Sequence, residues 1–503
     1  MVRSKQIVAF AATGALVLAA CGGSDDSSDS DASEAETDVT EAVDEAETDV
    51  TEAVEEAETD TTEAMEEAET DTTEAMEEAE TDTTEAMEEE GDEAASGAVF
   101  AVDTSACDDP DEATAPIDGT VKIGSSIPLS GGPAVLFAPF ADGQQAYIDY
   151  YNSEFGGVDG HELELVVKDD QYTADLTVAN VDELVFDEGV HLLSGIIGSA
   201  NNLAIQGDMN AQCIPQLNAS TGAPDWGEVD TNPWTTGLLV PYAIESQVWA
   251  EQAAADGATT AGLFYVNNEF GQAYADAFGE AAEANGIEIV ASETIEAADS
   301  GAPSGQVTNL VAADPDTILA VPLGAQCIAF MTELGNQQAA NPDFDASVYQ
   351  TATCANPVFF GAVTNGGADG VFTSNNLKDV NDPDVAANDE GAAAYLAAFE
   401  ATGSDADPGG IAAAGWESME IAVKAIQEAA EAGNLSREGI INAARNVDYS
   451  SLLLLEGLNY VMNAEDGFLA EGTQVRVWSD ELAGFESVGD PIDLNGTLGV
   501  YTP

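Results

Sequence analysis

The chain has 503 residues, of which 96 are acidic and 9 are basic, so its formal net charge at pH 7 is -87. Because binding to phosphate groups depends on Lys and Arg, this balance excludes a nucleic-acid-binding protein and one that docks on an anionic membrane surface. Residues 1–99 hold 33 acidic and two basic side chains, which leaves 63 acidic and seven basic ones for the globular remainder, a balance consistent with a saline habitat.

The first twenty residues predict a signal peptide. Arg3 and Lys5 precede an apolar run over residues 7–17, and Leu18-Ala-Ala-Cys21 follows it. This pattern is typical of a secretory signal and is too short to span a bilayer stably. Leu18 to Cys21 resembles the lipobox of bacterial lipoproteins, which implies cleavage after residue 20 and a lipid anchor on Cys21. An ordinary signal peptide cleaved nearby is the alternative, and both predictions place the protein outside the cytoplasm.

An acidic repeat follows the predicted anchor. Residues 34–44 recur almost unchanged at 45–55, 56–66, 67–77 and 78–88, with five acids and no base in each copy. A period of about 3.67 residues suits a helix or coiled coil, but the apolar face is thin and the charges repel one another. We therefore predict that residues 21–98 form a disordered, extended spacer. Calcium or cell-wall binding is an alternative, although the repeat lacks the turn glycine of a calcium loop.

Four cysteines remain once Cys21 is assigned to the anchor. They are Cys107, Cys213, Cys327 and Cys354. An even number in an oxidising compartment predicts two disulfides. Of the three pairings that the sequence allows, we expect Cys107–Cys213 and Cys327–Cys354, and four buried free thiols are the alternative. No spacing resembles a metal site.

From about residue 117 onward, apolar β-branched runs alternate with alanine-rich helical stretches. The predicted strands lie at 121–127, 163–168, 192–197, 214–217, 262–266, 287–292, 317–321 and 348–353, with a strand pair in 474–488. The predicted helices lie at 138–152, 175–186, 201–210, 271–285, 304–313, 326–337, 410–432 and 437–446. This alternation predicts an α/β fold with two doubly wound parallel sheets. Residues 117–241 with about 374–454 would form one lobe, and 242–373 with 455–503 the other, leaving a ligand cleft between them.

Several local motifs carry a family resemblance over residues 119–503. They are Ile123-Gly-Ser-Ser-Ile-Pro-Leu-Ser-Gly131, Phe155-Gly-Gly-Val-Asp-Gly-His161, Leu165-Val-Val-Lys-Asp-Asp170, Gly195-Ile-Ile-Gly-Ser199, Cys213-Ile-Pro-Gln-Leu-Asn-Ala-Ser-Thr221 and Tyr265-Val-Asn-Asn-Glu-Phe-Gly271. In this order and after a lipobox, they resemble the type I periplasmic solute-binding proteins, specifically the leucine/isoleucine/valine-binding family of ABC importers. The resemblance implies a monomer that closes around a small molecule by a hinge and passes it to an ABC permease, without a cofactor.

The resemblance also implies a set of ligand-binding residues. They are Ser130 and Phe137 after the first strand, Ser199 where a strand meets a helix, Ser220 and Thr221 after the fourth strand, and Phe270 after the first strand of the second lobe. At Ser199, a hydroxyl and free backbone N–H groups suit a carboxylate, although a plain helix cap is the alternative. Phe137 and Phe270 have core packing as their alternative.

Two positions depart from the pattern of the amino-acid-binding members. Gly222 stands where those members have a carboxylate-binding threonine, and Thr221 is a candidate substitute. Thr353, the seventh candidate ligand-binding residue, stands where they have an acid that pairs with the ligand ammonium. Because an unpaired buried ammonium is costly, the ligand need not be a simple α-amino acid. The family also takes amides, short carboxylates and aromatic acids.

No motif points to catalysis. The two histidines, His161 and His191, fit structural or exposed positions, and the chain has no nucleophile elbow, phosphate loop or zinc-binding histidine pair. The resemblance gives Asp170 a role near the cleft, with a structural role as the alternative. We therefore expect a binding protein and no enzyme. The second hypothesis is a ligand-sensing module of the same fold that reports to a membrane receptor.

Overall fold

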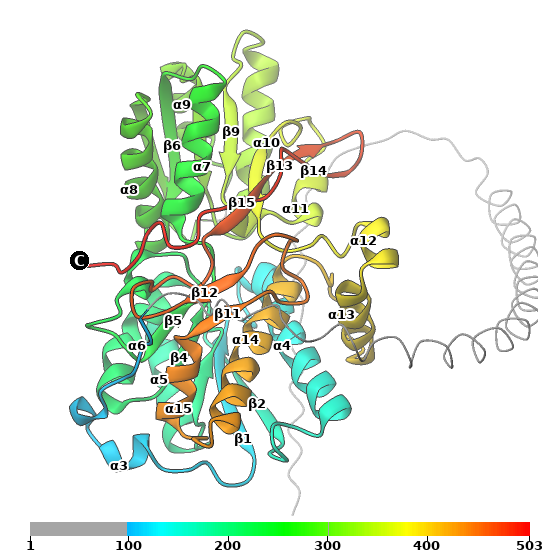
Figure 1. The fold of residues 1–503 in the computed structure, drawn as a ribbon. Helices are drawn as coiled ribbons and strands as arrows, with labels where there is room; N and C mark the ends of the chain where they lie inside the picture. The colour runs from blue at the N-terminus through cyan, green and yellow to red at the C-terminus, as the bar shows by residue number, and fades with distance from the viewer. Residues whose placement is uncertain (1–97, 300, 503) are drawn as a thin grey trace, which may run out of the picture. The chain divides into compact units, whose positions relative to one another are not determined.

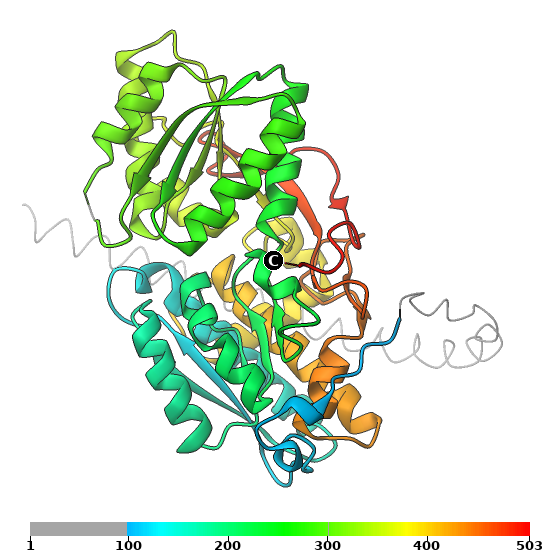
Figure 2. The same cartoon turned by 90° about the vertical axis from the view of Figure 1, so that its left-hand side faces the viewer.

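The computed structural model describes residues 98–299 and 301–502, which belong to one compact unit. The predicted signal peptide, Cys21 and the repeats of residues 34–88 lie outside the described residues. Figures 1 and 2 show that the compact unit consists of two lobes, each built on a sheet with helices packed against it.

The first lobe contains a parallel sheet of order β2-β1-β3-β4-β5. Its strands are β1 (Val121–Ile127), β2 (Leu163–Asp169), β3 (Leu192–Ser194), β4 (Gln216–Ala219) and β5 (Thr235–Gly237). The helices of this lobe are α4 (Ala134–Phe155), α5 (Ala174–Phe186), α6 (Ser199–Gln212), α14 (Ile411–Glu431) and α15 (Arg437–Ala444). Strand β1 is almost wholly buried, as its run of apolar and small residues requires in a sheet covered on both faces. This order confirms the doubly wound sheet predicted for the first lobe.

The second lobe contains a mixed sheet of order β14-β13-β10-β9-β8-β6-β7, with β15 paired to β13. Its strands are β6 (Thr260–Val266), β7 (Glu288–Ile295), β8 (Thr317–Val321), β9 (Ser347–Gln350), β10 (Phe372–Asn375), β13 (Gly472–Ser479), β14 (Gly484–Ser487) and β15 (Ile492–Asp493). Its helices are α7 (Tyr242–Ala255), α8 (Glu269–Ala284), α9 (Ser304–Ala313), α10 (Ala325–Ala340) and α11 (Pro357–Gly361).

The second sheet is parallel except at one edge, which is formed by the predicted strand pair of the C-terminal segment. Strands β6 to β10 are parallel to their neighbours, whereas β13 runs antiparallel to β10 and to β14. The physical reason is the route of the chain: it reaches β13 from the first lobe and not through a crossover helix after β10. Nothing in that route imposes the parallel direction that a βαβ crossover requires.

Two strands end three residues earlier than predicted. Strand β3 stops at Ser194 because Gly195 adopts a positive φ of 73°, and Ile197 keeps only an isolated bridge to Ser220. Strand β9 stops at Gln350, where Thr351 caps a 3-10 turn over Ala352–Cys354. Both shortened strands leave loops at the carboxyl edges of their sheets.

The long helix α14 belongs to the first lobe although it follows the second lobe in sequence. It packs closely on α4, and two glycines make this approach feasible. A Cβ on Gly143 would lie 1.9 Å from the Ala412 carbonyl oxygen, and one on Gly415 would lie 2.0 Å from that of Phe140. The chain therefore returns to the first lobe after β10, before it ends in the second.

The remaining elements are short or lie in the connections between the lobes. They are η1 (Thr104–Ala106), α3 (Pro110–Ala113), η2 (Pro224–Gly227), η3 (Ala352–Cys354), α12 (Pro383–Asn388), α13 (Glu390–Ala401), β11 (Val447–Tyr449) and β12 (Tyr460–Met462).

The described part of the chain contains one disulfide in each lobe, and both have the pairing that we predicted. Cys107 pairs with Cys213 across a Cα–Cα distance of 5.5 Å, at the C-terminal end of α6. Cys327 of α10 pairs with Cys354 across 5.9 Å and so ties that helix to the turn after β9. The alternative of four free thiols is therefore wrong.

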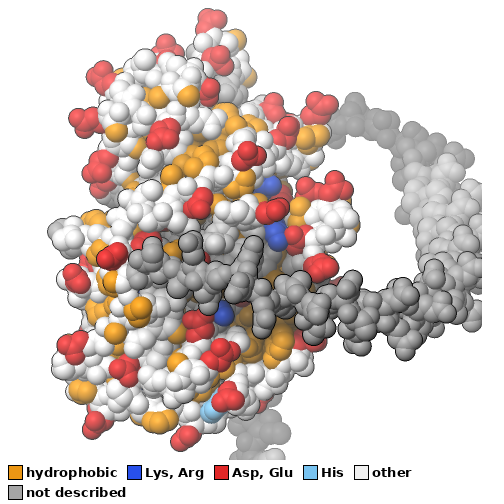
Figure 3. Space-filling model, in the orientation of Figure 1, with side chains coloured by type: hydrophobic (Ala, Val, Ile, Leu, Met, Phe, Trp, Pro, Cys, Tyr) orange, Lys and Arg blue, Asp and Glu red, His pale blue; other side chains and the backbone are white. Residues whose placement is uncertain are grey.

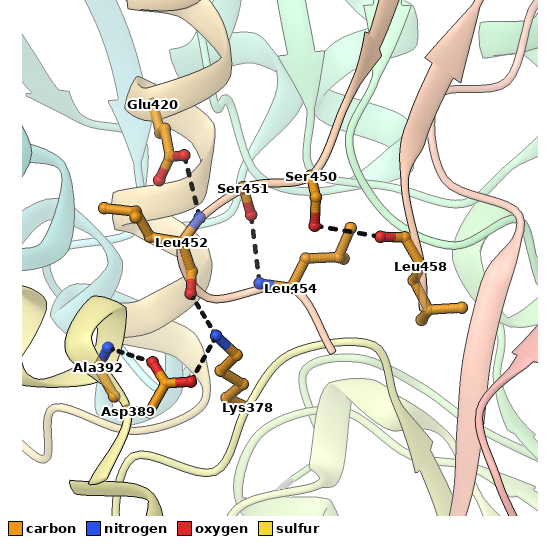
Figure 4. A network of polar contacts seen from close by, with 9 residues as sticks. All are labelled: Lys378, Asp389, Ala392, Glu420, Ser450, Ser451, Leu452, Leu454 and Leu458. Atoms are coloured by element: carbon orange, nitrogen blue, oxygen red, sulfur yellow. Dashed lines mark hydrogen bonds and ion pairs between the residues drawn. The ribbon is translucent and has the colours of Figure 1, made fainter. Parts of the chain in front are cut away.

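A polar network joins the segments that cross between the lobes (Figure 4). Lys378, which follows β10, donates to the Leu452 carbonyl oxygen at 2.8 Å and pairs with Asp389 at 2.7 Å. The Leu452 N–H group in turn donates to Glu420 of α14 at 3.2 Å. A single lysine thus links the segment after β10, the start of α13 and the segment before β12.

Carboxylates are scattered over both lobes on the face in Figure 3, and basic side chains are few there. Among the described residues, no helix combines the length and hydropathy that a membrane span requires. Nor does this part of the chain bring together three His, Cys, Asp or Glu side chains that could hold a metal ion.

Candidate functional site

A cavity lies between the lobes, at the carboxyl ends of strands from both sheets. Its empty volume is about 1020 Å³ with the open mouth and its solvent included. The first lobe contributes residues that follow β2, β3 and β4, and the second contributes residues that follow β8, β9 and β10. This is the position where open α/β sheets bind ligands.

Aromatic side chains form much of the cavity wall. Phe137 of α4 stacks on Tyr172, with ring centroids 5.6 Å apart and planes 5° from parallel. From the second lobe, Tyr242 and Tyr274 stack at 3.9 Å, and Phe270 meets the ring of Tyr242 edge-on at 5.7 Å. Such a wall favours a ligand with an apolar or aromatic body.

The polar part of the wall contains amides, hydroxyls and one carboxylate. The lining polar residues are Ser220, Glu245, Thr353, Asn356, Asn375, Asn376 and Thr473. None of the seven basic side chains of residues 98–299 and 301–502 is among the lining residues; they are Lys122, Lys168, Lys378, Lys424, Arg437, Arg445 and Arg476.

Glu245 is the carboxylate of the wall, and the sequence analysis missed it. It lies one turn into α7 and is buried, with 3% of its surface exposed. Its carboxylate accepts hydrogen bonds from the Ser374 and Tyr274 hydroxyls. Burial raises the pKa of Glu245 to about 7 in spite of these two donors.

Four of the seven residues predicted to bind ligand line the cavity. They are Phe137, Ser220, Phe270 and Thr353. Ser199 and Thr221 lie behind the wall: they are buried, and their hydroxyl oxygens are 2.7 Å apart. The Thr221 hydroxyl also lies 3.4 Å from that of Tyr242. These two residues therefore support the wall.

Ser130 lies outside the set of lining residues. Its side chain is exposed, and its hydroxyl donates to the Asp169 carboxylate at 2.5 Å. The same carboxylate accepts the Leu129 N–H group at 2.9 Å. Ser130 thus helps to close the loop after β1 onto the end of β2.

Asp170 has a positioning role. It is buried, which raises its pKa, and its carboxylate accepts from the Ser126 and Thr177 hydroxyls. It also accepts the Tyr172 N–H group at 2.9 Å. Because Tyr172 adopts a positive φ of 59°, this bond holds a strained residue whose ring lines the cavity.

The histidines have no place in this cavity. His161 makes a 2.5 Å contact from Nδ1 to the Gly119 carbonyl oxygen in a turn of the first lobe. His191 Nδ1 accepts the Lys122 N–H group at the start of β3, and burial lowers the pKa of His191. Both contacts lie within the backbone framework of the first lobe.

Gly222 explains one departure from the amino-acid-binding pattern. A Cβ there would lie 2.4 Å from the Val240 carbonyl oxygen and 2.7 Å from the ring of Tyr242. A threonine at this position would therefore collide with both the Val240 backbone and the ring of Tyr242. The place of its side chain is taken by the ring of Tyr242.

Comparison with known proteins agrees with this architecture. The model of the family described as "Periplasmic binding protein" matches residues 120–480. The chemotactic signal transduction system substrate-binding protein BasB of Halobacterium salinarum is 29% identical over 210 residues, which are 39% of this chain and 49% of that protein. The match therefore spans about half the length of that curated relative.

Solved structures share the fold at low sequence identity. A fatty acid ABC transporter substrate-binding protein of Thermomonospora curvata has a TM-score of 0.64 and 18% identity, covering 76% of this chain and 94% of its own. A possible leucine/isoleucine/valine-binding protein of Rhodopirellula baltica has a TM-score of 0.61 and 17% identity, and the match covers 76% of this chain and 98% of that one. A third structure is an ABC transporter solute-binding protein of Rhodopseudomonas palustris in complex with 4-hydroxybenzoate. It has a TM-score of 0.61 and 17% identity, and the match covers 74% of this chain and 97% of that one.

The family match covers well over half of the chain, and the two lobes with a cavity at their strand ends are the arrangement that the motifs of the first lobe predicted. The chain belongs to the periplasmic binding protein family.

Proposed function

We propose that the protein is an extracytoplasmic solute-binding protein, anchored to the cell membrane by a lipid on Cys21, that delivers its ligand to an ABC permease. Its ligand would be an amino acid of the branched-chain type or a related small polar compound. The observation that carries this proposal is the cavity between the lobes, whose wall combines aromatic side chains with a few hydroxyls and amides.

The proposed mechanism is capture by hinge closure, without bond chemistry. Residues from both lobes line one cavity, so a ligand that contacts both would favour the closed arrangement. The segments that cross between the lobes would bend, and the permease would recognise the closed monomer. Phe137, Ser220, Phe270 and Thr353 are proposed to contact the ligand directly.

A thermal-shift screen of the full chain tests the binding function. The compounds would be amino acids, amides, short carboxylates and aromatic acids. A ligand present at a hundredfold excess over its Kd stabilises the native state by about 2.7 kcal/mol. A selective rise in Tm with one chemical class would support the proposal, and no rise with any class in folded protein would contradict it.

The anchor needs its own test, because it concerns residues outside the described part of the chain. Expression of the full chain and of Cys21→Ala in bacterial cells, followed by separation of membrane and soluble fractions, measures the anchoring. We expect the unaltered chain in the membrane fraction and the variant outside it. Equal distribution of the two would refute the lipid anchor.

The second candidate function is a ligand-sensing module that acts with a membrane receptor. The similarity to a chemotactic signal transduction substrate-binding protein favours it. Deletion of the gene separates the two candidates: loss of uptake of the bound compound would support the importer. Loss of taxis toward that compound with uptake intact would support the sensor.

A further inference from the structure

The charge of the cavity wall limits the charge of its ligand. Of residues 98–299 and 301–502, Glu245 is the one carboxylate that lines the cavity, and no Lys or Arg of this part of the chain does. A ligand carboxylate would find no cationic side chain among these lining residues, whereas a ligand cation would find a buried carboxyl group with which to pair. Burial strengthens such a pair because little water screens it.

Glu245 has unused capacity to accept hydrogen bonds. The Ser374 hydroxyl donates to Oε1 and the Tyr274 hydroxyl to Oε2, and Thr351 supports Tyr274 by donating to its oxygen at 3.1 Å. A carboxylate offers about four lone-pair sites, so two donors from the protein leave sites for a ligand. These contacts also hold the carboxylate in one orientation at the cavity wall.

Thr473 is a second and independent sign of a polar ligand group. It lines the cavity, it is fully buried, and its hydroxyl oxygen has no hydrogen-bond partner in the described structure. Buried hydroxyls normally have partners, so this oxygen calls for one. Strand β10 pairs Ser374 with Val475, and Thr473 is two residues before Val475. Side chains two residues apart point to the same face, so Thr473 and the Ser374 partner of Glu245 share one face of the sheet.

The surrounding rings suit a cation with an apolar body. Tyr274, which donates to Glu245, stacks on Tyr242, and Phe270 stands edge-on to both rings. The faces of aromatic rings are negative and attract cations, while their area binds apolar groups. A cavity with a carboxylate, a free hydroxyl and aromatic walls is therefore matched to an organic amine.

We propose that Glu245 and Thr473 bind the cationic amine of the ligand, and that the apolar body of the ligand lies among Tyr242, Phe270 and Phe137. This inference rests on the proposed function and names the chemical class of the ligand. It also assigns the ammonium partner to α7, whereas the position where the amino-acid-binding members carry their acid is Thr353.

Matched probes that differ only in the amine test this inference on the unaltered full chain. The first series is leucinamide, leucine, and their counterparts without the amine, 4-methylpentanamide and 4-methylpentanoate. The second is tyramine against 4-ethylphenol, for an aromatic body. Isothermal titration and thermal shift measure the binding. We expect the amine-bearing members to bind at least about 30-fold more tightly than their counterparts, as for a buried charge pair.

Variants of the carboxylate give a second readout. Glu245→Gln should weaken the binding of the amine probes by about 30-fold or more and leave the binding of the uncharged probes without an amine unchanged. The control is Glu333→Gln, because Glu333 of α10 is a buried carboxylate with its own donors, Ser304 and Gln337, and does not line the cavity. This control should bind all probes like the unaltered chain.

The probe series on the unaltered chain keeps the inference falsifiable even where Glu245→Gln does not fold. Equal or tighter binding of the probes without an amine would overturn it, and so would a failure of every amine probe to bind. The proposed function would survive either result if another class in the broader screen stabilises the protein. It would fall only if no compound of any class does.

Discussion

The two disulfides allow stability and ligand binding to be separated. In the chain-entropy description, the stabilisation by a disulfide grows with the length of chain that it closes. The Cys327–Cys354 bond has a sequence separation of 27 and the Cys107–Cys213 bond one of 106, which correspond to about 3.6 and about 4.8 kcal/mol. Replacing both cysteines of a pair by serine should lower the free energy of unfolding by these amounts at most, because native strain reduces the effect.

The expected effects on ligand binding have the opposite order. Cys354 ends the turn over Ala352–Cys354, and Ala352 and Thr353 of that turn line the cavity. Cys213 caps the far end of α6, about 20 Å along the helix from the lining residue Gly198. We therefore expect Cys327→Ser/Cys354→Ser to weaken binding by about tenfold, and Cys107→Ser/Cys213→Ser to leave it unchanged while losing more stability.

Guanidinium unfolding followed by tryptophan fluorescence measures the stability of both variants. Titration with the tightest compound of the thermal-shift screen measures their binding, at a denaturant-free condition where both are folded. Weakened binding in the Cys107→Ser/Cys213→Ser variant, or intact binding in the other, would refute the argument that the second disulfide positions the cavity wall.

Three further predictions follow from burial, close packing and net charge. Burial raises the pKa values of Glu417 and Glu420 in α14, so the folded state holds protons that the unfolded state releases, and stability should fall as the pH rises above the ordinary glutamate value of 4.5. The free energy of unfolding of Glu420→Gln minus that of the unaltered chain, measured in urea, should rise by at least ~1.4 kcal/mol between pH 5 and pH 8. A difference that does not change with pH would contradict this. Gly222→Ala should displace Tyr242 and weaken ligand binding about tenfold, as measured by titration. The control Gly207→Ala has open space around its Cβ position and should bind ligand like the unaltered chain. Equal affinities of the two variants would refute the steric argument. Raising NaCl from about 0.05 to about 1 M should raise the Tm, because it screens the repulsion among the excess carboxylates, and a flat Tm would show that this repulsion costs little.

The sequence was most informative where burial determines the choice of residues. Strand β8 and helix α9 begin and end at the predicted residues, and β1 does as well. Strand β8 is a nearly continuous apolar run, β1 is a run of apolar and small residues, and α9 has apolar residues at helical spacing. Such patterns are the ones that secondary structure imposes most directly. Strand β10 was not predicted, since its four residues are held by partners that are far away in sequence, β9 and β13. Short strands of this kind have too little local pattern to be recognised.

Some cavity residues could likewise be predicted from local sequence motifs, whereas others depend on strands that are distant in sequence. Phe137 and Phe270 were predicted from motifs beside strand ends, where ligand contacts are expected in any open α/β sheet. Thr473 had no such motif, because it reaches the cavity on a strand that returns from the end of the chain. Its unpartnered hydroxyl is visible only once β13 is placed beside β10.

Glu245 had one local signal, which the acidity of the chain concealed. Tyr242, Glu245 and Trp249 lie at i, i+3 and i+7 of α7, so they share one helical face, and all three are buried. In a chain of ordinary charge, an acid within an aromatic stripe would stand out as a buried polar group in need of a partner. In this chain, acidic residues are so common that the presence of one in a helix does not by itself indicate a functional site. What distinguishes Glu245 is therefore its neighbours at helical spacing, and the same test applied along other acidic chains should separate carboxylates that serve a site from those that only cover the surface.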